Sequence, residues 1–257
     1  MQREASRRIS GVVVITLPDT IRERGFSFIA GETFRRDLGQ VGSLEDWPGV
    51  AASWNDLELD CYLPEGARDR RRRFAVYSVD RDGRVERLPH QPHYQPAQYN
   101  VLFGGVDRWF APVAPEVGAS AAVTTILRYC DRLFRSLAPT ADSWRVETHQ
   151  FRIEARAGAP GKPTPEGVHR DGVNFVLVLL VERVNIVSGE TTVYDLASRR
   201  PLGSFTLTSP FDAALVDDAR VAHGVTPVSP LDPSRPGHRD VLVVTFRSTT
   251  PLEETKA

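Results

Sequence analysis

A histidine and an aspartate stand two positions apart in the segment Glu166–Val176, which reads Glu-Gly-Val-His-Arg-Asp-Gly-Val-Asn-Phe-Val. In a strand, side chains at positions i and i+2 project from the same face, so His169 and Asp171 can address one point. An imidazole and a carboxylate are two thirds of the facial triad that binds non-haem Fe(II) and leaves metal positions open for chemistry. His223, in a later apolar segment, is the candidate third ligand.

The pattern His-x-Asp is not specific by itself, because the chain contains it again at His238-Arg239-Asp240. Both copies read His-Arg-Asp, as in the catalytic loop of a protein kinase, but no Asp-Phe-Gly follows and no glycine-rich loop precedes them. The second copy has no histidine downstream to complete a triad. Spacing alone leaves a metal site and a structural histidine open for the first copy.

Composition limits the classes of protein to which the chain can belong. With 257 residues, 41% hydrophobic and 25% charged, it fits one β-rich globular domain. A net charge of −1 and a pI near 6.6 do not favour a broad nucleic-acid-binding surface. The cysteines Cys61 and Cys130 form neither a disulfide framework nor a zinc signature, which fits a reducing cytoplasm.

Membrane insertion and secretion are not expected either. The longest apolar run, Phe175–Val181, is far too short to span a bilayer. Residues 1–18 contain a short apolar run followed by Pro18 and Asp19 in place of a small-residue cleavage site, so we expect no signal peptide. The sequence leaves the oligomeric state open.

Hydrophobic periodicity divides the chain into an early part with helices and a late part made of strands. Apolar residues at steps of three and four predict a helix over residues 116–137, with Cys130 as a packed thiol on its apolar face. A capping-box pattern predicts the start of a helix at Ser43, and Asp19 could cap a short helix ending at Arg24. Strands are predicted at residues 11–17, 26–29, 74–79, 84–88, 144–156, 168–183, 190–196, 202–208, 213–217, 221–228 and 239–248.

Short strands separated by turn signals are typical of a double-sheet jelly roll. Because the helices come early and the strands late, we expect the N-terminal half to support one sheet of the barrel. The sequence therefore predicts a mainly β (α+β), cupin-like fold buttressed by N-terminal helices. One domain covers residues 1–257, with residues 1–140 as support and 141–250 as the jelly-roll core.

Two further segments contain residue types that can bind ligands. The run Arg70–Arg73 could bind an anion, but a solvated strand end is the favoured interpretation because the chain is otherwise not basic. His90 and His93 have a spacing that metal ligands can have, but neighbouring prolines favour an extended segment. Residues 89–115 lack periodicity, and a long irregular loop of this kind is often functional.

A 2-oxo acid could occupy the open positions of a facial triad, and 2-oxoglutarate would need a cation for its far carboxylate. Arginine suits this because its fork binds carboxylates through two nitrogens. Arg239 opens the last long strand and is the candidate, with a surface salt bridge as the alternative. Arg247 has the same strand parity but lies about 26 Å further along, at ~3.3 Å per residue.

The motif Pro165–Val176, with Gln150-Phe151-Arg152-Ile153 before it, resembles the bacterial 2-oxoglutarate/Fe(II) dioxygenase family that includes isoleucine 4-hydroxylase. Residues 185–194 and 239–246 resemble the same family, and the similarity runs from about residue 25 to the last strand. Ser188 departs from the pattern, since a glycine is expected in its turn.

The resemblance implies a double-stranded β-helix, Fe(II), 2-oxoglutarate and O2. It implies that His169, Asp171 and His223 bind the iron and that Arg239 anchors 2-oxoglutarate. The implied reaction decarboxylates 2-oxoglutarate to succinate and hydroxylates an unactivated carbon of a free L-amino acid or a close derivative.

The substrate partners are less constrained by the sequence. Gln95, Asn100, Arg108 and Asn174 are candidates to bind the amino acid, although each could instead stabilise a loop. Two alternatives stay open: the same chemistry on a protein or carrier-tethered substrate, and a non-catalytic cupin-like metal-binding module.

Overall fold

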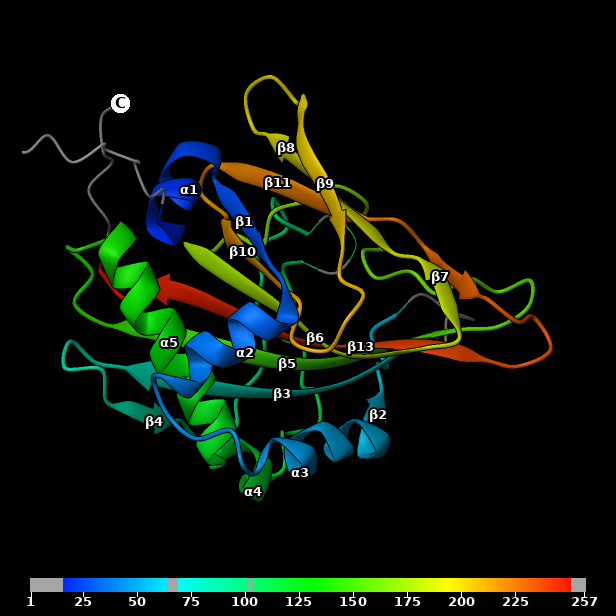
Figure 1. Ribbon diagram of the computed structural model, residues 1–257, viewed down its shortest axis with the longest axis horizontal. Coiled ribbons are helices and arrows are strands. Elements are labelled where there is room, and N and C mark those ends of the chain that lie inside the picture. The colour runs from blue at the N-terminus through cyan, green and yellow to red at the C-terminus, as the bar shows by residue number, and fades with distance from the viewer. Residues whose placement is uncertain (1–15, 64–68, 101, 103, 251–257) are drawn as a thin grey trace, which may run out of the picture.

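A large antiparallel sheet forms the centre of the protein. The computed structural model describes residues 16–63, 69–100, 102 and 104–250. The strands of the large sheet are Phe26–Ile29 (β1), Glu58–Leu59 (β2), Arg70–Val79 (β3), Val85–Arg87 (β4), Trp144–Ala155 (β5), Phe175–Val184 (β6), Ala213–Asp217 (β10) and Gly237–Ser248 (β13). Their order is β1-β10-β6-β13-β5-β3-β2, and β4 pairs with β3 (Figure 1). The predicted N-terminal support therefore contributes β1 and β3 to the same sheet as the C-terminal strands.

Two small sheets complete the barrel. Their strands are Ile186–Ser188 (β7), Glu190–Asp195 (β8), Pro201–Thr206 (β9), Val221–Val225 (β11) and Val228–Pro230 (β12). The order is β11-β8-β9 in one sheet, and β12 pairs with β7 in the other, all antiparallel. This is the jelly-roll arrangement that the spacing of strands and turns predicts, so the mainly β fold class is confirmed.

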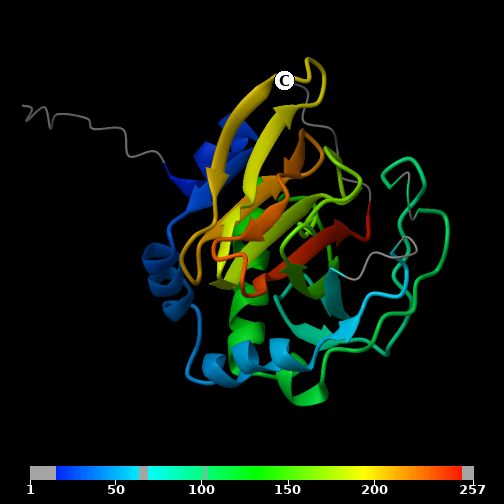
Figure 2. The ribbon, with the colours of Figure 1, turned by 90° about the vertical axis from the view of Figure 1, so that its right-hand side faces the viewer.

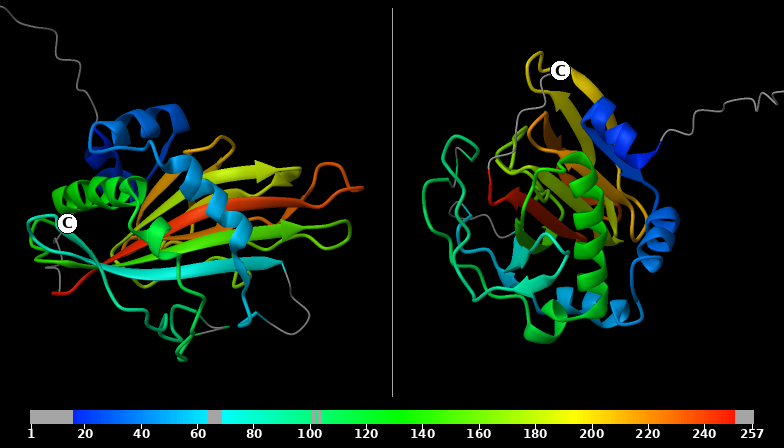
Figure 3. Two further views of the ribbon diagram at one scale, coloured as in Figure 1. Left: turned by 90° about the horizontal axis from the view of Figure 1, so that it is seen from below. Right: turned by 90° about the vertical axis from the view of Figure 1, so that its left-hand side faces the viewer.

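Helices cover one face of the large sheet. They are Leu17–Arg24 (α1), Gly31–Gly39 (α2), Trp47–Ala52 (α3), Pro115–Gly118 (α4) and Ala121–Leu137 (α5), with a 3-10 turn at Ser53–Asp56. Figure 3 shows α5 lying along the sheet, and Figure 2 shows residues 89–100 and 104–113 standing apart from the helices. Among the described residues, no helix is long and apolar enough to cross a membrane.

The alternation of side chains along β13 explains how one face of the sheet forms the core and the other lines a cavity. Leu242, Val244 and Phe246 are buried in the main core with residues of α5 such as Phe134. Val243, between them in sequence, lines a cavity on the opposite face. Because neighbouring side chains point to opposite faces of a strand, the helices stabilise one face and leave the other for a site.

Several predicted boundaries are wrong at the N-terminal side. The strand predicted over residues 11–17 lies mostly outside the described residues, and Leu17 is already the first residue of α1. Thr16, not Asp19, caps that helix, and the two side chains form a reciprocal capping box. The helix predicted from Ser43 begins at Trp47. In place of a cap there, Asp46 accepts hydrogen bonds from the N–H groups of Ala121 and Ala122 (2.7 and 2.9 Å), which stabilises the start of α5.

The predicted helix over residues 116–137 is two helices, because Ser120 interrupts it and caps α5 through the Val123 N–H. The predicted strand over residues 168–183 begins only at Phe175. The first part of the predicted strand instead turns at Gly172, whose φ of 76° is accessible to glycine. The N–H groups of this turn donate to a carboxylate, whereas those of a strand would donate to a neighbouring strand. The helix α2 and the short strand β7 were not predicted.

Candidate active site

The backbone brings the predicted metal ligands together from two distant segments. His169 and His223 form an isolated antiparallel bridge in which each N–H donates to the other's carbonyl at 2.9 Å. The fully buried carboxylate of Asp218 accepts the N–H groups of Asp171, Gly172 and Val173 at 2.9, 2.8 and 3.1 Å. The turn that carries Asp171 is therefore fixed by charge-assisted hydrogen bonds.

We call His169, Asp171 and His223 the His169 group. The Nε2 atom of His169 lies 3.8 Å from Asp171 Oδ1, and that of His223 lies 4.0 Å from Asp171 Oδ2. His169 Nδ1 lies 3.0 Å from the Gly167 carbonyl, to which it donates, so the Nε2 lone pair faces the carboxylate. Glu166 adds a second carboxylate, 3.4 Å from His169 Nε2.

The burial of this group sets the charge of its members. Burial and the neighbouring His169 lower the pKa of His223 to about 3, so its ring is neutral at physiological pH. Burial would lower the pKa of His169, but the Asp171 and Glu166 carboxylates raise it above its ordinary value. Burial raises the pKa of Asp171. Two imidazoles facing a desolvated carboxylate form a donor set that a divalent cation would stabilise.

A cavity of about 130 Å³ extends from the His169 group to Arg239, and we call it the Arg239 cavity. Its walls include Thr191, Leu207 and Val241. Arg239 is only 2% exposed, and its Nε has no acceptor among the described residues. Burial and the nearby Arg183 lower the pKa of Arg239 to about 10, which leaves a buried cation facing the cavity.

A second cavity, of about 80 Å³, adjoins the first, and we call it the Arg72 cavity. The two share Asp171, Glu166, Arg70 and a few apolar residues as walls. Described residues with charged or amide side chains that line it are Arg70, Arg72, Gln95, Asn100, Arg108, Glu147, Glu166, Asp171 and Arg247. This cavity is therefore polar and reaches the carboxylate of the His169 group.

The interpretation of the arginine run as a solvated strand end is wrong for two of its members. Arg70 and Arg72 are 7% and 4% exposed, because alternate residues of β3 face the cavity. Arg70 is bound by Asp60 at 2.8 Å. Arg71 and Arg73 face the other way, and Arg71 bonds Glu154 at 2.7 Å.

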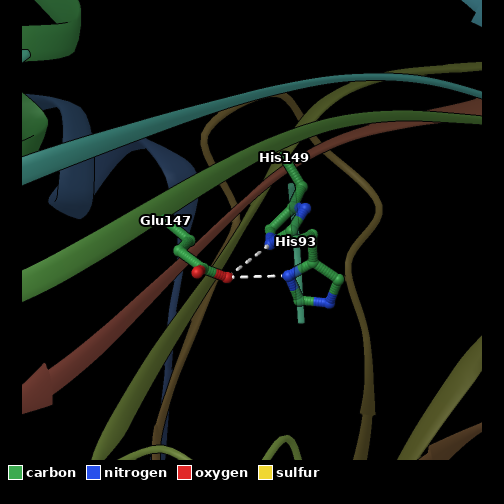
Figure 4. A group of neighbouring side chains, drawn as sticks. All are labelled: His93, Glu147 and His149. Carbon is green, nitrogen blue, oxygen red and sulfur yellow. Dashed lines mark hydrogen bonds and ion pairs between the residues drawn. The ribbon is translucent and has the colours of Figure 1, made fainter. Parts of the chain in front are cut away.

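A second set of two histidines and a carboxylate lies in the Arg72 cavity (Figure 4). We call His93, Glu147 and His149 the His93 group. His93 Nδ1 lies 2.8 Å from Glu147 Oε2, and His149 Nε2 lies 3.9 Å from the same oxygen. Burial lowers the pKa of both histidines, and Arg72 lowers that of His149 further. His93 thus has the partners that the sequence did not reveal, while His90 is exposed and contacts the Trp109 ring.

The second His-Arg-Asp copy is a structural feature. The carboxylate of Asp240 binds Arg152 through two hydrogen bonds of 2.8 and 2.6 Å. His238 lies 3.7 Å from that carboxylate, which Arg152 already binds, and 3.6 Å from Glu182. Of this copy, only Arg239 lines the Arg239 cavity.

The sequence profile of the 2OG-Fe dioxygenase family matches residues 51–245. The chain belongs to the 2OG-Fe dioxygenase family. It is 25% identical to the 3(1)-hydroxy-L-isoleucine 4-dioxygenase of Pantoea ananatis, over 88% of this chain and 93% of that protein. Among solved structures, a bsmA homologue from Methylobium petroleophilum is 36% identical with a TM-score of 0.81, covering 90% of this chain and 92% of the other. IDO from Bacillus thuringiensis shares the fold, with a TM-score of 0.71, 19% identity and coverage of 91% and 98%.

A 2OG-Fe dioxygenase uses Fe(II), 2-oxoglutarate and O2, and each of the two histidine groups contains residue types that bind iron. A histidine that binds a metal through one nitrogen donates a hydrogen bond from the other. His169 meets this condition through Gly167, whereas Nδ1 of His223 is buried and has no hydrogen-bond partner among the described residues. His149 does not, because Arg72 Nη2 lies 2.6 Å from its Nδ1 and arginine can only donate. The Nε2 of His149 therefore carries the proton and has no lone pair for a metal.

The structure places most of the predicted substrate residues in the Arg72 cavity. Gln95 donates to the backbone carbonyl of Asp171 at 3.0 Å and accepts from Asn100 at 3.0 Å. Arg108 lines the same cavity, and its Nη2 lies 3.5 Å from Gln95. Asn174 lines neither cavity, and its Oδ1 accepts from the Ser248 N–H. The binding roles of these residues stay predictions.

Sequence reasoning missed Glu147 and His149 of the Arg72 cavity, and it favoured a solvated strand end for Arg72. A signal was available, since Arg70 and Arg72 share one strand parity and Glu147 and His149 share another. The register that sets β3 beside β5, with Arg72 opposite Phe151 and Phe74 opposite His149, joins distant parts of the chain. That register could not be read from either segment alone.

Proposed function

We propose that this protein hydroxylates an unactivated carbon of a free L-amino acid, with oxidative decarboxylation of 2-oxoglutarate to succinate. In this proposal His169, Asp171 and His223 bind the iron, and Arg239 binds the far carboxylate of 2-oxoglutarate. Bound iron would supply the activation of dioxygen. The protein's own side chains would hold the two small molecules and exclude bulk water from between them.

One observation supports this assignment most strongly: Asp171 is a wall of both cavities. A buried arginine without a full set of acceptors stands at the end of one cavity, as a dicarboxylate anchored at a distance from the metal would require. The other cavity has arginine and glutamate side chains together. Those two types can pair with the carboxylate and the ammonium group of an amino acid beside the same metal.

The size of the second cavity favours a free amino acid over a polymer. About 80 Å³ accommodates a small molecule, and its walls come from three strands (β3, β5 and β13), the turn that carries Asp171 and the irregular segment, including Tyr94 and Gln95. The Pantoea ananatis relative is named for an amino-acid derivative, which agrees with this size. A protein or carrier-tethered substrate would have to reach Asp171 through the same opening.

The test begins without any substrate. Anaerobic protein loaded with Fe(II) is titrated with 2-oxoglutarate, and the visible metal-to-ligand charge-transfer band is followed. We expect a band in the wild type and in His90→Ala, and none in His223→Ala. Addition of O2 and a panel of L-amino acids should then give substrate-dependent succinate and a product one oxygen atom heavier. No band in folded, iron-replete wild type would overturn the iron and 2-oxoglutarate assignment and favour a metal-binding module.

A further inference from the structure

Positive charge dominates the Arg72 cavity. The described charged residues that line it are Arg70, Arg72, Arg108, Arg247, Glu147, Glu166 and Asp171. Some of these charges are already neutralised: Asp60 binds Arg70 at 2.8 Å, and Arg145 binds Glu147 at 3.1 Å. Asp171 belongs to the His169 group.

With Arg108 left aside, the remaining charged lining residues are Arg72, Arg247 and Glu166, an excess of one positive charge among the residues that the structure describes. The two histidines of the cavity add no charge at physiological pH, because their pKa values are lowered by burial. A zwitterionic amino acid has no net charge and would leave this excess in place. A substrate with a second acidic group would reduce it.

Arg72 is a buried cation with weak compensation. The nearest carboxylate oxygen, on Asp60, is 3.6 Å from its Nη1 and is already bound by Arg70. Its Nη2 donates to the neutral ring of His149, and its Nε has no acceptor in the described part of the chain. A desolvated cation in this condition is unfavourable unless an anion completes its hydrogen bonds.

Two aromatic rings pack against the guanidinium of Arg72. Its carbon lies 3.5 Å from the centroid of the Phe110 ring and 4.5 Å from that of Phe151. These contacts stabilise the cation and hold it in position at the cavity wall. A carboxylate binds an arginine edge in the same plane, through two oxygens.

The described walls of the Arg72 cavity offer little to an aliphatic side chain. Among the described residues, the apolar walls are Phe151, Val173 and Val243, together with the ring of Tyr94. An isoleucine or leucine side chain would displace water from guanidinium and amide groups without replacing the hydrogen bonds. Sites built from buried polar groups reject ligands that leave those groups unpaired.

We propose that the substrate is an acidic amino acid, whose side chain carries a second carboxylate, and that Arg72 is the residue that selects this charge. The inference rests on the proposed function, since it names the class of amino acid that the same site accepts. The proposal also gives the His93 group a role. His149 holds the guanidinium of Arg72 in position by accepting its hydrogen bond, and the group binds no metal.

The test measures binding separately from turnover. The Fe(II) and 2-oxoglutarate complex, with 2-oxoglutarate saturating so that its own site is filled, is titrated anaerobically with L-aspartate, L-glutamate and L-2-aminoadipate. L-Asparagine, L-glutamine and L-isoleucine are the uncharged comparisons. Shifts of the charge-transfer band report the dissociation constants. We expect at least one acid to bind about tenfold or more tightly than its amide, and to support succinate formation on addition of O2.

Arg72→Gln should reduce the ratio of amide to acid dissociation constants to near one. Arg71→Gln is the matched control, since that side chain lies on the other face of the same strand, and it should keep the wild-type ratio. Thermal unfolding reports whether each variant is folded. If Arg72→Gln is not folded, Arg72→Met, which also removes the charge, takes its place with the same expected ratio.

Two results would overturn the inference: amides or isoleucine that bind wild type as tightly as the acids, or an acid preference that survives in folded Arg72→Gln. The proposed function fails in a different way. In that case the charge-transfer band forms, but no amino acid of either class yields succinate above the uncoupled background.

Discussion

The His169 group and the His93 group contain the same kinds of side chain, yet their surroundings differ, and we propose iron binding for the first alone. In both, two histidines and a carboxylate place one possible ligand atom each within 4.8 Å of the others. The difference lies in the atoms behind them. His169 has a backbone carbonyl behind its outer nitrogen, at 3.0 Å, whereas His149 has a guanidinium there, at 2.6 Å.

The charges of the neighbouring side chains also favour a metal ion in the His169 group over one in the His93 group. The His169 group lies beside the carboxylates of Glu166 and Asp218, which favour a cation. The His93 group lies beside Arg72 and Arg145, which do not. The separation of ligand atoms alone therefore does not distinguish a metal site from a polar recognition site. The hydrogen bond behind His169 and the neighbouring carboxylates are the features that favour the His169 group as the metal site.

The largest effect should come from removing a histidine of each group. His223→Ala should abolish the charge-transfer band and turnover, with at least about a hundredfold loss of iron affinity, because it removes a direct ligand. His149→Ala should keep the band and bind one equivalent of iron. Metal analysis after anaerobic loading measures both. A loss of iron in His149→Ala, or a second tightly bound equivalent in wild type, would contradict the distinction between the groups.

The arginines of the two cavities should separate co-substrate from substrate. Arg239→Ala should raise the dissociation constant of 2-oxoglutarate about a hundredfold, since it removes a buried charged partner. Arg72→Gln should change that constant by less than about threefold, because Arg72 does not line the Arg239 cavity. Anaerobic titration of the band gives both values, and Arg235→Ala, an exposed change, is the control. Equal effects of the two substitutions would mean that one anion site spans both cavities.

A smaller effect is expected at Asp218, which contacts no ligand atom and holds the turn of Asp171. Asp218→Asn should weaken iron binding about 10–100-fold, because an amide has one acceptor oxygen for three backbone N–H groups. Competition with a calibrated chelator measures the affinity. Asp217→Asn, at the neighbouring position, makes none of these contacts and should leave it unchanged. An unaltered affinity in folded Asp218→Asn would show that the turn holds its shape without this carboxylate.

The His169 group could be predicted from the sequence more completely than the His93 group, for a physical reason. His169 and Asp171 are neighbours, and their spacing is visible in one segment, although they lie in a turn and not in the predicted strand. The jelly roll follows from short strands and turns, which are local features. Arg239 was predictable because it opens the last long strand.

The Arg72 cavity depends on pairings between distant strands. Arg72 and His149 meet because β3 pairs with β5 in one register, and a shift of β3 by one residue would turn Arg72 to the helical face, away from His149. His93 reaches Glu147 from the irregular segment, whose path has no periodic signal. A run of arginines also reads as a charged surface until the burial of alternate members is known.

The smallest effect concerns the pH dependence of stability and tests the neutral state of His149. Burial, and Arg72 next, lower the pKa of His149 well below its ordinary value of 6.5. Below pH 6.5 the unfolded chain therefore takes up a proton at this residue while the folded protein does not. Folding stability is present above that pH and is lost as the pH falls, by up to about 1.4 kcal/mol per pH unit.

His149→Gln removes this proton uptake while leaving an acceptor for Arg72. The unfolding free energy of metal-free wild type, relative to that of His149→Gln, should therefore fall by about 1–2 kcal/mol between pH 7 and pH 5. Urea unfolding at each pH measures the difference. His90→Gln, at an exposed position, should follow wild type throughout. A constant difference between wild type and His149→Gln would mean that His149 is protonated in the folded protein, and Arg72 could then not donate to it.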